Sequence, residues 1–194
     1  MLAALIALGT GGCAVMGKAD APITLRLAPA TGAAPATKPD PRSVSVAGVD
    51  ATGAAAKTRY AFIDPTRPGE INQAKSLFWE VPPSKAVELA LVTGLRARFA
   101  AVTGPGLSLP ADLRVLTTLT RFEEVSGTPG SAVVAFDATV IEHGKVARTG
   151  TWCARAAFAG PSPSDRAQAF EAALTGATTA FAQDLASGAT PAGC

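Results

Sequence analysis

Alternating hydrophobic and polar residues predict β-strands over much of the chain after residue 43. Such alternation places every second side chain on one face of a sheet. Glu142-His143-Gly144-Lys145 joins two of these runs, and its glycine supplies the positive φ that a tight hairpin needs. The pattern therefore predicts a long hairpin within a larger sheet. The predicted strands and extended segments cover residues 43–49, 59–63, 75–80, 112–122, 131–142 and 145–158.

Two other segments repeat hydrophobic residues every three or four positions, which is typical of amphipathic helices. The first runs from Ser84, the expected N-cap, to Val102, and Gly104-Pro105-Gly106 ends it. The second follows Pro161-Ser162-Pro163-Ser164, and Ser187-Gly188 ends it. This order of elements predicts an α+β two-layer sandwich, with both helices on one face of a mostly antiparallel sheet.

Composition narrows the function of such a domain. Hydrophobic residues make up 48% of the chain but aromatic residues only 6%, so the core has few large side chains. The net charge of +2 leaves no basic excess to neutralise a phosphate backbone, and no nucleic-acid partner is expected. One His and three Cys, without a zinc-type spacing, predict no metal site, and no cofactor is expected.

The N-terminus has the pattern of an export signal. Residues 1–8 form an apolar run that is too short to span a bilayer. Gly9-Thr10-Gly11-Gly12-Cys13 follows, and small residues before a Cys resemble the lipobox of bacterial lipoproteins. We expect residues 1–12 to be a signal peptide, with its positive segment supplied by a start site further upstream. Cys13 is the expected lipidated residue; the alternative is an ordinary apolar N-terminus with an incidental Cys.

Residues 13–42 are rich in Pro and Ala and are interpreted as a tether. One island, Ile23–Leu27, alternates apolar and polar residues and predicts a short strand. The single α+β domain is then expected to cover residues 43–194.

If Cys13 is lipidated, an even number of cysteines remains, namely Cys153 and Cys194. Thiols pair in the oxidising compartments that exported proteins enter. We therefore predict a Cys153–Cys194 disulfide that fixes the C-terminal tail to a strand. The alternative is one buried and one frayed terminal cysteine.

The chain carries little catalytic material. Its only histidine, His143, lies in the predicted hairpin turn, and no GxSxG or nucleotide-binding glycine motif occurs. Glu123 and Glu124 are adjacent, so they face opposite sides of a strand, and a solvated edge is their expected setting. No catalytic residue is assigned, and the protein is not expected to be an enzyme.

One short motif stands between a strand and the first helix, at Phe78-Trp79-Glu80-Val81-Pro82-Pro83. The two prolines stop the extended segment. Trp79 is expected either to pack over the start of the helix or to contact a partner. Trp79, Glu80, Pro82 and Pro83 are therefore the candidate partner-contact residues.

With this motif, the chain resembles the ABC-type transport auxiliary lipoproteins, the paraquat-inducible protein C group. The resemblance covers most of the chain in order. It is carried by Cys13, Ile23–Leu27, Tyr60–Phe62, Trp79–Pro83, Ser84–Val102, Ala132–Phe158 and Ser164–Ala186.

The resemblance implies a non-catalytic periplasmic lipoprotein that accompanies an ABC permease, an ATPase and mammalian-cell-entry (MCE) domain proteins. Such systems move lipids between the two membranes of Gram-negative bacteria, and this component would dock the assembly at the outer membrane. Ala14 follows Cys13, where Asp would signal inner-membrane retention, so an outer-membrane lipoprotein facing the periplasm is expected. The family also implies that a homo-oligomer is plausible.

Two other functions remain open. One is an outer-membrane assembly lipoprotein resembling the lipopolysaccharide-transport plug, which shares a sheet-and-helices plan. The other is a small lipid-binding module with a pocket between helices and sheet. Co-purified proteins distinguish the first from a transport component, and a dry cavity in the structure would favour the second.

Overall fold

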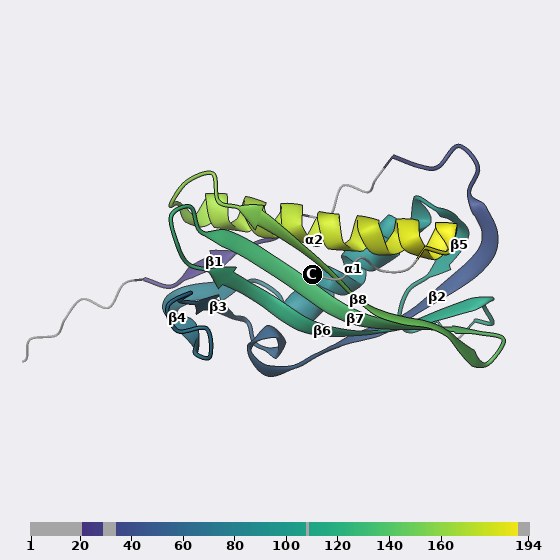
Figure 1. Ribbon diagram of the computed structural model, residues 1–194, viewed down its shortest axis with the longest axis horizontal. Coiled ribbons are helices and arrows are strands. Elements are labelled where there is room, and N and C mark those ends of the chain that lie inside the picture. The colour runs from purple at the N-terminus through teal and green to yellow at the C-terminus, as the bar shows by residue number, and fades with distance from the viewer. Residues whose placement is uncertain (1–20, 29–33, 108, 190–194) are drawn as a thin grey trace, which may run out of the picture.

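The computed structural model describes residues 21–28, 34–107 and 109–189. These residues form eight strands, two α-helices and one short 3-10 helix, η1 (Figure 1). In chain order the elements are β1 (Ile23–Leu25), β2 (Asp40–Ala51), η1 (Gly53–Ala56), β3 (Arg59–Ile63), β4 (Ile71–Trp79), α1 (Pro83–Arg96), β5 (Phe99–Thr103), β6 (Leu113–Val125), β7 (Ser131–Glu142), β8 (Lys145–Ala157) and α2 (Pro163–Ser187).

All eight strands join one mixed sheet that forks at β6. On one edge, β6 pairs with β7 and β7 with β8, in two long antiparallel ladders. Along the other edge, β2 and then β3 lie end to end, both parallel to β6. β5 pairs with the outer edge of β2. On the other branch, β4 pairs with β3, and β1 pairs with β4. The predicted α+β class is confirmed, and short parallel pairings add to the antiparallel ladders.

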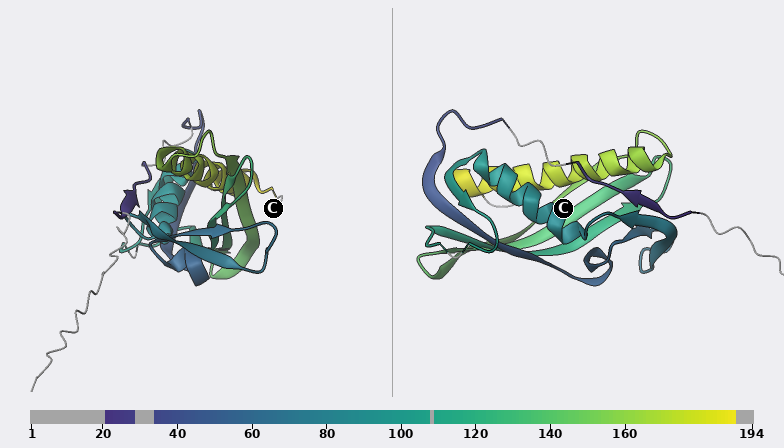
Figure 2. Two further views of the ribbon diagram at one scale, coloured as in Figure 1. Left: turned by 90° about the vertical axis from the view of Figure 1, so that its left-hand side faces the viewer. Right: turned by 180° about the vertical axis from the view of Figure 1, so that it is seen from behind.

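Both helices cover one face of this sheet (Figure 2). α2 packs on β7 and β8, α1 packs on β2 and β5, and the helices contact each other. α2 begins in the predicted segment Pro161-Ser162-Pro163-Ser164, and Ser162 is its N-cap. The Ser162 hydroxyl accepts from the Asp165 backbone N–H, while the Asp165 carboxylate accepts from the Ser162 backbone N–H. α1 begins one residue before the predicted cap Ser84: its N-cap is Pro82, and Pro83 occupies the first turn without a side-chain cap.

The predicted first helix is wrong beyond residue 96. Phe99 and Val102 fit its hydrophobic spacing, but they belong to β5, which pairs in parallel with β2. Two apolar residues at helical spacing cannot distinguish the end of a helix from a short strand. The tertiary pairing with β2 decides the outcome.

The region interpreted as a tether is partly folded. β1 pairs with β4 over three residues, and Leu25 is buried. Two residues after β1 contact the helical layer: the backbone N–H of Ala28 donates to Glu171 of α2 at 2.5 Å, and that of Ala36 donates to the carbonyl of Ala97, the residue after α1, at 2.7 Å. β2 then begins at Asp40, three residues before the predicted domain boundary.

The elongated molecule has two distinct ends, which we name by their segments (Figure 1). The β1 end contains β1, the β3–β4 hairpin and the start of α2. The loop end contains the β5–β6 connection at residues 104–112, the His143-Gly144 turn and the last turns of both helices. Because α2 has 25 residues, the two ends are separated by at least about 37 Å.

Candidate functional site

The Trp79–Pro83 segment forms a tight corner between β4 and α1. The Trp79 backbone N–H donates to the Thr58 carbonyl at 2.6 Å, and that of Glu80 to the Leu25 carbonyl at 2.8 Å. The chain then turns at Val81-Pro82, because proline removes a donor and fixes φ near the value that begins a helix. The corner is therefore held by β1 on one side and by the residue before β3 on the other.

Trp79 supports this corner from inside the protein. Its side chain is 4% exposed, and its ring lies 5.4 Å from Tyr60, 5.3 Å from Phe122 and 4.9 Å from Phe170, centroid to centroid. The pairs with Phe122 and Phe170 are edge-to-face and the pair with Tyr60 is tilted, and aromatic pairs at these distances stabilise a core beyond the area they bury. Two roles were expected for Trp79, and the structure places its indole in the core, where it packs against other rings. Pro83 is buried as well.

The exposed part of the corner carries an ion pair. The Arg26 guanidinium donates to both carboxylate oxygens of Glu80, at 2.6 and 2.7 Å. These hydrogen bonds hold the pKa of Glu80 below its usual value and raise that of Arg26. Pro82 and Val81 are exposed beside the pair. We name Arg26, Glu80, Val81 and Pro82 the corner surface. The partner contact expected for Trp79, Glu80, Pro82 and Pro83 stays a prediction, and Glu80 and Pro82 are the exposed members of that set.

A polar cluster that the sequence did not indicate lies near the aromatic rings. Glu124 is buried and accepts from the Tyr60 hydroxyl at 2.7 Å, Arg166 Nε at 3.0 Å and the Ser126 hydroxyl at 3.1 Å. Burial, and then the Glu124 carboxylate, raise the pKa of Tyr60. The cluster ties the first turn of α2 to β3 and β6, because Arg166 of α2 and Tyr60 of β3 both donate to Glu124 of β6. Arg166 also donates to the Pro161 carbonyl.

Glu123 and Glu124 face opposite sides of β6 as predicted, but the solvated edge expected for them is wrong. Glu123 is buried on the other face and pairs with Arg121 at 2.7 Å. A regular alternation in β6 is interrupted between Leu119 and Arg121, where the register shifts by one residue. Because of this bulge, Phe122 and Glu124, rather than Arg121 and Glu123, face α2 after Leu119.

The other predicted site residues lie in different parts of the molecule. Cys153 is on β8, opposite Ala135 of β7. Cys13 and Cys194 are outside the described residues, so lipidation and disulfide pairing stay predictions. His143 occupies the hairpin turn with φ of 50°. Within residues 21–28, 34–107 and 109–189, no three His, Cys, Asp or Glu side chains gather as a metal site.

Neither helix combines the length and hydrophobicity that crossing a membrane requires, over the part of the chain that the structure describes. The fold is thus a small α+β sandwich whose mixed sheet is covered on one face by two helices. The family model for the ABC-type transport auxiliary lipoprotein component matches residues 24–186. The chain belongs to this family.

Several solved structures are similar to this chain at low sequence identity. The Xanthomonas campestris protein XCC0632 superposes with a TM-score of 0.71 at 20% identity, covering 86% of this chain and 96% of its own. A second, uncharacterized protein gives 0.68 at 11% identity, covering 86% and 99%. The PelC dodecamer from Paraburkholderia phytofirmans gives 0.45 at 13% identity, covering 76% and 91%. No curated protein sequence matches the chain.

Proposed function

We propose that this protein is a non-catalytic lipoprotein of an MCE-linked ABC transport system that moves lipids between two membranes. It faces the periplasm, is anchored in the outer membrane through Cys13, and docks the transport assembly there. Its partners are then the MCE-domain protein and the ABC permease and ATPase of the same system. The family match over residues 24–186 is the observation that carries this proposal.

The entry point of the chain supports one orientation of the anchored protein. β1 begins ten residues after Cys13, and ten extended residues reach at most about 35 Å. A lipid on Cys13 therefore holds the start of β1 within about 35 Å of the anchoring point. The loop end, at least the length of α2 away, is left free to extend into the periplasm.

The anchor is tested by Cys13→Ser in cells that process lipoproteins. We expect the variant to leave the outer-membrane fraction, because only the Cys thiol can carry the diacylglycerol. Folding is checked by the thermal melt of the purified variant. Unchanged fractionation of a folded variant would remove the lipoprotein anchor from the proposal.

The docking role is tested by co-purification of the membrane-anchored protein with the MCE protein and permease expressed beside it. Recovery of both supports the proposal, whereas recovery of an outer-membrane barrel protein favours the assembly-lipoprotein alternative. Charge reversal by Glu80→Arg tests the corner surface, and Glu70→Arg is its control because Glu70 is also an exposed, Arg-paired carboxylate. We expect Glu80→Arg to reduce recovery of the MCE protein and Glu70→Arg to leave it unchanged.

We also propose the Cys153–Cys194 disulfide. Arg148 of β8 donates to the Asp184 carbonyl at 2.7 Å, so the last turn of α2 lies beside β8. The distance along the strand from Arg148 to Cys153 is about 17 Å. The six residues after Gly188 can span about 20 Å, which is enough for Cys194 to reach Cys153.

A further inference from the structure

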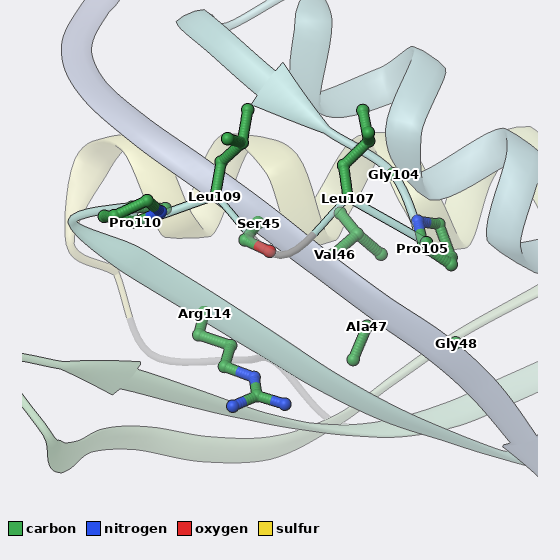
Figure 3. Close-up of a pocket in the computed structure, with 12 residues that line it drawn as sticks. Ser45, Val46, Ala47, Gly48, Gly104, Pro105, Leu107, Leu109, Pro110 and Arg114 are labelled. Atoms are coloured by element: carbon green, nitrogen blue, oxygen red, sulfur yellow. The ribbon is translucent and has the colours of Figure 1, made fainter.

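The β5–β6 connection crosses the face of the sheet that the helices leave open. β5 and β6 lie on opposite sides of β2 and both run parallel to it, so residues 104–112 must cross over this strand. Figure 3 shows the loop in front of β2 while α2 lies behind it. A hollow of about 550 Å³ separates the loop from the strand. This volume is in the range of small-molecule sites.

One end of the hollow is polar and carries an unused cation. Arg114 of β6 stands next to Ser45 of β2 in the sheet register, and both line the hollow. Unlike Arg26, Arg121 and Arg166, Arg114 has no hydrogen-bond or ion-pair partner among the described residues. An exposed guanidinium offers several N–H donors in a plane that matches carboxylate and phosphate oxygens.

Acidic side chains near the hollow are already engaged. Glu88 lies beside Gly48, which lines the hollow, and the Glu88 carboxylate pairs with Lys85 at 3.0 Å. Asp112 accepts from both the backbone N–H and the hydroxyl of Ser43, each at 2.7 Å, and these bonds hold its pKa below the usual value. Neither carboxylate forms an ion pair with the Arg114 guanidinium, which is left for an external anion.

The other end of the hollow is apolar. Leu107 and Leu109 line it from the loop, and they are 60% and 58% exposed. Figure 3 shows both side chains extending from the loop on the side opposite Arg114. Gly104-Pro105-Gly106 and Pro110 flank the two leucines, so bulky side chains are kept away from the wall. The hollow is therefore an amphipathic site, with the Arg114 guanidinium at one end and two exposed leucines at the other.

We propose that this hollow binds an anionic amphiphile, a single acyl or alkyl chain with a carboxylate or phosphate head. The head pairs with Arg114 and accepts from the Ser45 hydroxyl, and the chain lies against Leu107 and Leu109. The hollow bordered by Tyr60 and Glu124 at the β1 end does not offer this chemistry, because its charged groups already satisfy one another. The site is independent of any docking role of the protein.

Binding is measured by titration calorimetry on the full chain carrying Cys13→Ser, with probes kept below their micelle concentrations. The probes are laurate, dodecyl phosphate, dodecanol and inorganic phosphate. We expect laurate or dodecyl phosphate to bind at least tenfold more tightly than dodecanol and than phosphate alone. A preference for laurate indicates a fatty acid as the source, and a preference for dodecyl phosphate indicates a lipid phosphate. Equal affinity for dodecanol, or no binding of either charged amphiphile, overturns the proposal.

Paired variants locate the site. Arg114→Gln should weaken binding about tenfold or more, since a charged hydrogen-bonded pair is lost. The double change Leu107→Ser and Leu109→Ser should weaken it by a similar factor, because two apolar contacts are removed. Arg155→Gln and Leu89→Ser are the matched controls, since both residues are exposed and lie away from the hollow. Affinity that survives both test changes in folded protein contradicts the assignment.

Discussion

The β1 end and the loop end have similarly packed cores, but they differ in whether the charged side chains near their surfaces are paired within the protein. Each half of α2 carries a Phe into an aromatic cluster: Phe170 contacts Trp79, and Phe181 contacts Trp152. At the β1 end, however, the charged groups pair with each other, as in Arg26–Glu80 and the buried Glu124 cluster. The loop end leaves leucines and a cation uncovered. We infer that the paired charges of the β1 end mainly stabilise the fold and leave its corner surface for the predicted protein contact, whereas the exposed Leu107, Leu109 and Arg114 of the loop end serve a small ligand.

The largest expected effect is the removal of a ring from the β1 end. Phe170 is fully buried against Tyr60, Trp79 and Phe122. Phe170→Ala should lower the free energy of unfolding by about 3–5 kcal/mol, because the cavity cannot collapse around three other rings. Urea denaturation followed by far-UV circular dichroism measures the loss. A cost below about 1 kcal/mol would mean that this cluster does not stabilise the β1 end.

The proposed disulfide is expected to have the next largest effect, and it strengthens the loop end. Under oxidising conditions Cys153→Ser should lower the free energy of unfolding by about 2–4 kcal/mol, since the cross-link no longer restricts the unfolded chain. In excess reductant the variant and the parent should be equally stable. Cys194→Ser is the control and should behave identically. Alkylation of both thiols in the oxidised parent protein would exclude the bond.

The free energy of unfolding is expected to change with pH, because the buried Tyr60–Glu124 cluster contains a titratable hydroxyl that the exposed ion pairs lack. Tyr60 is the only tyrosine of the chain, and burial with the Glu124 hydrogen bond raises its pKa. Above pH ~10 the unfolded chain loses this proton while the folded protein keeps it, so stability falls with rising pH by about 1.4 kcal/mol per unit.

Denaturation midpoints of the parent and Tyr60→Phe at several pH values above 10 test this expectation. The parent should show the steeper fall, because lysines titrate in both proteins and their contribution cancels. Absorbance near 295 nm should stay constant in the folded parent until it unfolds. Identical slopes in the two proteins would contradict a buried, protonated Tyr60.

The smallest expected effect is at the loop end. Val146 is 64% exposed on the hairpin after His143-Gly144. Val146→Thr should change the free energy of unfolding by less than about 0.5 kcal/mol, because little apolar surface is buried there. The measurement is the same urea titration used for Phe170→Ala. A large loss would show that this surface is covered in solution, for example by a second copy of the chain, and the comparison between the ends would have to be revised.

The sequence predicted the elements that repeat a pattern over many residues. The β7–β8 hairpin with its His143-Gly144 turn and the start of α2 at Pro161-Ser162-Pro163-Ser164 follow from local chemistry, and each was found. β5 was missed because five residues are too few to establish a period, and its partner β2 lies more than fifty positions earlier. Short elements of this kind are determined by pairing, which local sequence does not contain.

The buried cluster was also beyond prediction, for a different reason. Tyr60, Glu124 and Arg166 lie far apart in sequence, and each is an ordinary residue in its own segment. Adjacent glutamates are usually solvated, because burying a lone carboxylate is costly. Only the fold shows that three donors meet one of them. Likewise, Trp79 could be recognised as an anchor but not assigned to the inside of the corner.

The placement of β1 in the sheet has a consequence for the order in which the protein folds. This strand is the first of the described elements in chain order, but its partner β4 follows more than fifty residues later. Closing such a loop costs entropy before any contact is gained, whereas the β6–β7–β8 meander needs only neighbouring segments. We therefore expect the meander to form early and β1 to pair with β4 late, so that this pairing is among the last contacts of the sheet to be completed.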